Sequence, residues 1–134
     1  MKTQFECLIR HDPNDKYGWY NLGVIAQNAK DTRAATQDFE RAITIDPHFE
    51  AALYNLGVVR LNVKDIDGAV TYLSRAVAGD PRDANAHWQL GLALARTDTH
   101  ANSGLAVKQL NAALKLDPSL VNTALNLHTV KGTR

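Results

Sequence analysis

The sequence predicts an all-α protein, a solenoid of repeated helical hairpins. Three observations support this. All four prolines follow an aspartate, and the dipeptides are Asp12-Pro13, Asp46-Pro47, Asp80-Pro81 and Asp117-Pro118. Successive prolines are 34, 34 and 37 residues apart. Leu-Gly pairs recur with the same period of 34 residues, at Leu22-Gly23, Leu56-Gly57 and Leu90-Gly91. A fixed period of this length is typical of repeat proteins, in which each repeat packs against its neighbours.

Within each period, apolar residues follow the spacing of two helices. In the first period, one helix face carries Trp19, Leu22, Gly23 and Ala26, and the next carries Ala35, Phe39, Ala42 and Ile43. Asp31 and Asp65 are suitable N-caps, and each Asp-Pro pair should end a helix, because proline disfavours a helical conformation in the preceding residue. We expect first helices at 16–29, 50–63 and 84–96, and second helices at 32–45, 66–79 and 103–116.

The third period carries a three-residue insertion near Thr97 to Ser103. The evidence is that Ala106, Leu110 and Ala113 match the second helices of the earlier periods three positions late. The inserted segment is polar, so we expect it to form a longer loop than its counterparts. This loop should be the most mobile internal segment of the chain.

The two ends are expected to hold incomplete repeats. Phe5 and Leu8 stand where Phe39 and Ala42 stand, so the N-terminal residues are interpreted as a second helix without its first helix. The C-terminal residues are interpreted as a capping helix, since His128 replaces the repeated glycine. The expected organisation is a single array over 1–134, with a half-repeat at 1–13, repeats at 14–47, 48–81 and 82–118, and a cap at 119–134. Either the protein begins within a repeat or the chain is a fragment of a longer one, and we favour the fragment.

Composition argues against several classes of function. The formal net charge is +1 and the basic residues are scattered, so we expect no nucleic-acid partner. No apolar stretch approaches the roughly 20 residues that a membrane span needs. We therefore expect no membrane insertion by this segment, and we favour the cytoplasm as its compartment. The single cysteine, Cys7, cannot form an internal disulfide and is expected to be inert.

The sequence lacks the common motifs of enzymes and of metal sites. The sequence has no Gly-rich phosphate loop and no Gly-x-Ser-x-Gly motif. The five histidines lack the i, i+4 pairing of a helical metal site. The aspartates that precede the prolines recur as turn residues, which favours a structural role over catalysis. We expect no enzymatic activity, no metal and no cofactor.

The repeated residues resemble the tetratricopeptide pattern W-x2-L-G-x2-Y…A-x3-F…P. The first repeat matches it at Trp19, Leu22, Gly23, Ala35, Phe39 and Pro47. The later repeats depart from it, since Leu53 and His87 replace the tryptophan; Ala26, Arg60 and Leu94 stand at the second aromatic position. The resemblance covers essentially the whole chain. It implies a right-handed α-solenoid whose first helices line a concave, protein-binding face.

On such a solenoid, one face of each first helix is left for a partner. The candidate peptide-binding residues are Tyr20, Asn21, Val24, Asn28, Tyr54, Asn55, Val58, Asn62, Trp88, Gln89, Leu92, Arg96 and Asn126, and near them we expect Tyr17, Asn85, Asn122 and Leu125. They include an aromatic column, Tyr20, Tyr54 and Trp88, and an amide column, Asn21, Asn55, Gln89 and Asn126. Amides can donate to and accept from a peptide backbone, and aromatic rings supply apolar area at low entropic cost. The Tyr-Asn pairs can also serve helix packing.

Two functions follow from these observations. The first is an adaptor whose groove binds an extended, roughly uncharged segment of a partner protein. A carboxylate clamp of the kind that some family members use for acidic tails is not expected, because only Asn55 fits it. The alternative is a scaffold that self-associates through its end helices, since an incomplete first repeat leaves apolar residues such as Ile9 under-covered.

Overall fold

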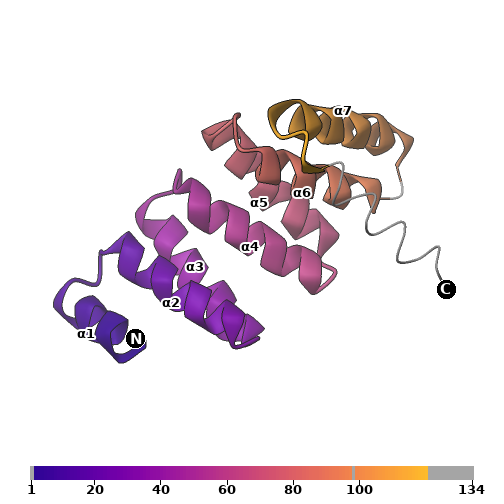
Figure 1. Cartoon of the computed structure of the whole chain (residues 1–134). Coiled ribbons are helices and arrows are strands. Elements are labelled where there is room, and N and C mark those ends of the chain that lie inside the picture. Colours follow the sequence, from indigo (N-terminus) through magenta and orange to yellow (C-terminus); the bar gives the residue numbers. More distant parts are fainter. Residues whose placement is uncertain (1, 98, 121–134) are drawn as a thin grey trace.

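The computed structural model describes residues 2–97 and 99–120, and this part of the chain consists of helices and short connections, without a strand (Figure 1). The helices are α1 (Lys2–His11), α2 (Lys16–Asn28), α3 (Thr32–Ile45), α4 (Glu50–Asn62), α5 (Ile66–Gly79), α6 (Ala84–Ala95) and α7 (His100–Leu116). The predicted all-α class is confirmed. The expected helices agree with the observed ones to within one residue at every end except the start of α7. No helix of the described chain is long and apolar enough to cross a membrane.

The helices pair into hairpins that stack in chain order. α2 packs mainly on α3, α4 on α5 and α6 on α7, and successive hairpins are joined by contacts of α3 with α4 and of α5 with α6. Figure 1 shows the resulting array, which runs from the indigo α1 at one end to the orange α7 at the other. This nearest-neighbour stacking is the arrangement that defines a solenoid.

The repeated glycines allow the two helices of each hairpin to approach closely. A Cβ atom on Gly23 would lie 2.6 Å from the Phe39 ring, and one on Gly57 would lie 2.6 Å from Leu73. Phe39 and Leu73 are among the largest fully buried side chains of the structure. The large residue of the second helix therefore fills the space that the glycine leaves.

The turns inside the first two hairpins share one backbone geometry. Lys30 and Lys64 have φ of 61° and 66°, in the left-handed region. Asp31 N–H donates to the Ala26 carbonyl, closing the helix end in the manner of a Schellman motif. The predicted caps are confirmed, because the Asp31 and Asp65 carboxylates accept N–H groups of the first turns of α3 and α5 at 3.2 and 3.1 Å.

The aspartates of the Asp-Pro pairs act as turn residues, as predicted. Each carboxylate accepts the N–H group two residues farther along the chain. These pairs are Asp12 with Asn14, Asp46 with His48, Asp80 with Arg82 and Asp117 with Ser119, at 3.1, 3.0, 3.1 and 3.0 Å. The bond fixes the chain between a second helix and the next first helix.

The prediction that the insertion forms a long loop reaching Ser103 is wrong. α7 begins at His100 rather than at 103, and it has 17 residues, whereas α3 and α5 have 14. The insertion therefore lengthens the helix. The physical reason is a cap that the sequence analysis missed, since the Thr99 hydroxyl accepts the Asn102 N–H at 3.3 Å. The predicted capping helix lies outside the described residues beyond Leu120.

Candidate functional site: the face of the first helices

The first helices lie next to one another along one side of the array. Cα atoms of α2 lie within 8 Å of α4, and those of α4 lie within 8 Å of α6. Among the described residues, no Cα atoms approach this closely between α3 and α5 or between α5 and α7. First helices that lie closer together than second helices make the array curve toward the first helices. The concave face is therefore formed by α2, α4 and α6.

The candidate residues on these helices are accessible. Tyr20, Asn21, Val24, Tyr54, Asn55, Val58, Trp88, Gln89 and Leu92 are half-buried, and Asn28, Asn62 and Arg96 are exposed, as are Tyr17 and Asn85. The leucines of the Leu-Gly pairs, on the opposite faces of the same helices, are buried. The structure thus places these candidates on one face. Asn126, with Asn122 and Leu125, lies outside the described residues.

Hydrogen bonds join the aromatic and amide columns across neighbouring helices. The Asn55 Nδ2 group donates to the Tyr20 hydroxyl at 3.0 Å. Burial and the charges of Asp83 and Glu50 raise the pKa of Tyr54 above its ordinary value, and a side-chain hydrogen bond with Gln89 opposes part of this rise. Each bond links a tyrosine to the amide 35 residues later, so we call these two bonds the rungs. Tyr20 and Asn55 therefore pack the array as well as line its face.

An aromatic cluster lies at the N-terminal end of the face. The Phe49 ring is 5.4 Å from the Tyr17 ring in an edge-on arrangement and 5.3 Å from the Tyr20 ring. Sequence reasoning missed Phe49. It stands at the N-cap position of α4, where α2 and α6 have Asp15 and Asp83, and it makes no side-chain cap. The exchange of a capping aspartate for an aromatic residue was the signal that could have revealed it.

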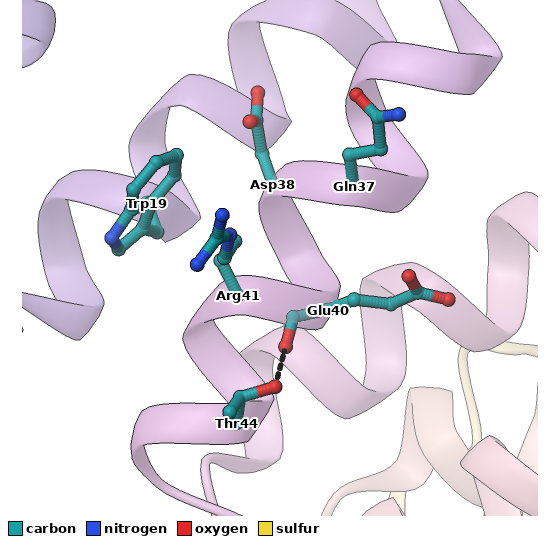
Figure 2. A pocket seen from close by; sticks show the side chains of 6 residues that line it. All are labelled: Trp19, Gln37, Asp38, Glu40, Arg41 and Thr44. Atoms are coloured by element: carbon teal, nitrogen blue, oxygen red, sulfur yellow. Dashed lines mark hydrogen bonds between the residues drawn. The ribbon is translucent and has the colours of Figure 1, made fainter.

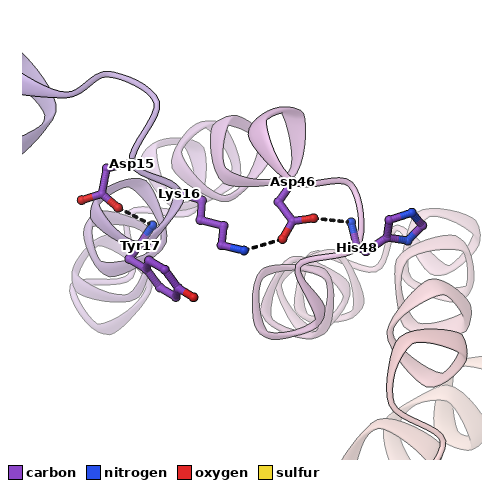
Figure 3. A network of polar contacts seen from close by, with 5 residues as sticks. All are labelled: Asp15, Lys16, Tyr17, Asp46 and His48. Carbon is purple, nitrogen blue, oxygen red and sulfur yellow. Dashed lines mark hydrogen bonds and ion pairs between the residues drawn. The ribbon is translucent and has the colours of Figure 1, made fainter.

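A paired lysine covers this aromatic cluster. The Lys16 Nζ group donates to Asp46 Oδ2 at 2.5 Å (Figure 3). The same group lies 5.0 Å from the Phe49 ring centre and 5.2 Å from that of Tyr17. The hydrogen bond to Asp46 raises the pKa of Lys16. Bonds from Lys16 and from the His48 N–H lower the pKa of Asp46. The ammonium is thus neutralised within the chain and does not make the face basic.

The start of α4 carries an acidic residue with an unusual environment. Burial, a hydrogen bond with Asp83 and the charges of Asp83 and Asp80 raise the pKa of Glu50 to about 7. The Glu50 Oε1 atom is buried and has no hydrogen-bond partner in the described chain. A carboxyl group held in this way is neutral for much of the time at neutral pH.

Two cavities lie next to the first helices. One of about 620 Å³ lies between α2 and α3 and is lined by Trp19, Gln37, Asp38, Glu40, Arg41 and Thr44. Figure 2 shows the Arg41 guanidinium directed toward the Trp19 ring, 5.4 Å from its centre. None of the candidate residues lines this cavity. A second cavity of about 350 Å³, at the ends of α2 and α4, includes the candidate Asn62.

The candidate residues of this face are mostly uncharged. Amide, hydroxyl and aromatic groups predominate among the candidate residues, and Arg96 is the one charged candidate on α2, α4 and α6. Within residues 2–97 and 99–120, no group of three or more histidine, cysteine or acidic side chains is placed to hold a metal ion.

Comparisons with known proteins agree with this geometry. The family model described as tetratricopeptide repeat matches residues 26–96, more than half of the chain. A structure of MamA from Desulfovibrio magneticus RS-1 superposes with a TM-score of 0.79 at 28% identity, covering 88% of this chain and 65% of that one. An O-GlcNAc transferase mutant from Thermobaculum terrenum superposes with a TM-score of 0.69 at 29% identity, over 77% of this chain but 19% of the transferase. A search of curated protein sequences gave no significant match.

Proposed function

The chain belongs to the tetratricopeptide repeat family, and we propose that its concave face binds an extended segment of a partner protein. The fold is that of a protein-interaction scaffold, and the repeat region is non-catalytic. The transferase among the similar structures is an enzyme by name, yet this chain spans 19% of it. The chain spans 65% of the MamA structure from Desulfovibrio.

One observation carries the proposal. The polar and aromatic candidates of α2, α4 and α6 are accessible on the side where these helices touch one another, while the leucines that pack each hairpin are buried. A continuous face of this kind, with one charged candidate, suits a neutral and extended ligand. Its amides supply both donors and acceptors for a peptide backbone.

The rungs change which residues should contact the ligand. The Asn55 amide donates one of its two hydrogens to the Tyr20 hydroxyl. Substituting Asn55 would therefore disturb helix packing and ligand binding at the same time. The exposed Asn28 and Asn62 are better probes of binding. Each bond from an amide to a partner backbone contributes roughly 0.5–1.5 kcal/mol net. This corresponds to roughly a 2- to 10-fold change in Kd.

The test starts from a peptide selected on the full chain from a random phage-displayed library. Its affinity is then measured by calorimetry for Asn28→Ala, Asn62→Ala and Asn111→Ala. Asn111 is an exposed asparagine of α7, a second helix, and serves as the matched control. We expect binding to weaken roughly 2- to 10-fold for each of the first two variants and to be unchanged for the third. Weakening by Asn111→Ala alone would contradict the proposal.

The alternative function, self-association through the end of the array, has its own supporting observation. A cavity of about 370 Å³ at the N-terminal end is lined by Ile9, Trp19 and Leu22 among others, between α1, α2 and α3. A helix of a second copy would cover the apolar residues of this cavity, which is also lined by the charged Glu6, Arg10 and Asp38. Light scattering after size exclusion separates the two functions, because only self-association predicts a mass that rises with concentration and falls in an Ile9→Asp variant.

A further inference from the structure

Glu50, the first residue of α4, takes the place that Lys16 takes in α2, one period of 34 residues earlier. In the first repeat, the Lys16 ammonium neutralises Asp46, the aspartate that follows α3. The corresponding aspartate of the second repeat is Asp80, which follows α5. The second repeat therefore has an acid next to an acid where the first repeat has an ion pair.

Two carboxylates of the turn between α5 and α6 act on Glu50, and both are committed to backbone amides. Asp83 caps α6 by accepting two N–H groups of its first turn at 3.0 and 3.3 Å. Asp80 accepts the Arg82 N–H at 3.1 Å. A carboxylate that accepts such bonds is favoured in its charged form. The proton of this cluster therefore belongs on Glu50.

Within residues 2–97 and 99–120, no cationic side chain forms an ion pair with Glu50. On α5, the Arg75 guanidinium donates to the Pro47 carbonyl at 3.0 Å. The backbone of Gly79, at the end of the same helix, faces the Glu50 Cβ atom, and the His48 ring is exposed. Tyr54, one turn along α4, is a neutral phenol at neutral pH, and burial raises its pKa further above the ordinary value. In the described chain, Glu50 takes part in no ion pair, and its Oε1 atom is buried without a partner.

We propose that Glu50 is a proton-operated lock between the second and third repeats. In the protonated form, its carboxyl group donates a hydrogen bond to Asp83 and holds the turn between α5 and α6 against α4. When the proton leaves to solvent, the resulting carboxylate is repelled by Asp80 and Asp83, and this junction loosens. The lock operates whether or not the concave face holds a peptide.

The position of the Glu50 pKa sets the pH range of the lock. Burial and the two aspartates raise the pKa to about 7 in the folded chain, from an ordinary value of 4.5. Between these two values the folded state binds more protons than the unfolded state, so the free energy of unfolding falls as the pH rises. The stabilisation from Glu50 is complete below about pH 4.5 and is lost by the time the pH has passed through about 7.

The contact between α4 and α6 also includes one of the rungs, the bond between Tyr54 and Gln89. A change at Glu50 can therefore affect the concave face. Tyr54 on α4 bonds to Gln89 on α6, one turn into each helix from the acidic cluster. A loosened junction between α4 and the start of α6 shifts these two side chains relative to one another. The distance between α4 and α6 on the concave face, and with it the fit of a ligand there, should therefore depend on pH near neutrality.

Thermal unfolding of the full chain between pH 5.5 and 8.5 tests the proposal with Glu50→Gln, Glu50→Lys and Asp67→Asn. Asp67 is an exposed acid at the start of α5 and serves as the control. We expect the Tm of the glutamine variant to exceed that of the wild type by an amount that grows with pH. Glu50→Lys rebuilds the ion pair of the first repeat with Asp80, so it should be stabilised most at the alkaline end. Asp67→Asn should keep the pH profile of the wild type.

Hydrogen exchange shows whether the effect is at the junction. After correction for intrinsic rates, amides at the start of α6 should exchange faster at pH 8 than at pH 6 in the wild type but not in Glu50→Gln. Amides of α2 should behave alike in both. The proposal is overturned if the Tm difference between wild type and Glu50→Gln is constant with pH, or if the extra exchange spreads evenly over the array.

Discussion

At the scale of single residues, three of the four proline carbonyls of the Asp-Pro turns accept a side-chain hydrogen bond in the described part of the chain, each from a different type of side chain. In chain order the pairs are Trp19 with Pro13, Arg75 with Pro47 and His87 with Pro81, at 2.8, 3.0 and 2.8 Å. Leu53, the repeat equivalent of Trp19 and His87, cannot donate, and an arginine from the next helix takes over. This explains how the chain departs from the tetratricopeptide pattern at two positions without leaving the turn carbonyls unsatisfied.

A pair of glycine substitutions tests the packing of the hairpins at the same scale. Ala at Gly57 places a Cβ atom 2.6 Å from Leu73, whereas nothing lies within 4 Å of a Cβ atom at Gly104 of α7. We expect Gly57→Ala to lower the free energy of unfolding by about 1–3 kcal/mol through overpacking. Gly104→Ala should raise it by about 0.5–1 kcal/mol through helix propensity. Urea unfolding measures both, and equal effects of the two substitutions would contradict the packing described here.

At the scale of helices, the sequence predicts most boundaries because the ends carry recognisable chemistry. Asp-Pro pairs end α3 and α5, and aspartates cap their beginnings. The start of α7 was missed because an insertion hides its cap, Thr99, in a polar segment that looks like a loop. Phe49 was missed for a related reason, since its role depends on rings from α2 that only the fold brings near it.

The Thr99 cap makes a prediction about α7. Thr99→Ala removes the acceptor for the Asn102 N–H and should cost about 0.5–2 kcal/mol of unfolding free energy. Amide hydrogen exchange should become faster in the first turn of α7 and stay unchanged in its last turn. Thr71→Ala is the control, because the Thr71 hydroxyl bonds back to the Asp67 carbonyl within α5 and its loss should cost little. An equal cost for both variants would mean that the helix is capped by other groups.

At the scale of the whole molecule, the resemblance to the tetratricopeptide pattern implies a concave face lined by the first helices, but it does not identify which residues of that face contact a ligand. The period of 34 residues put the candidates on one face of the first helices, and in the structure α4 contacts both α2 and α6. The rungs could not be foreseen, because they join residues 35 positions apart on helices whose separation only the fold determines. Asn55 consequently has a role in packing the array as well as a proposed role in ligand contact. The exposed Asn28 and Asn62 are therefore the better residues for testing ligand contact alone.

Chemical-shift mapping of the isotope-labelled chain with the selected peptide tests the binding of a partner on the concave face most directly. We predict that the perturbed amides lie on α2, α4 and α6, centred on Val24, Val58 and Leu92. Perturbation should be nearly as strong at about 300 mM salt as at about 50 mM salt, where the screening lengths are about 6 and about 14 Å. Perturbation concentrated on α3, α5 and α7, or around the Trp19 and Arg41 cavity, would contradict it.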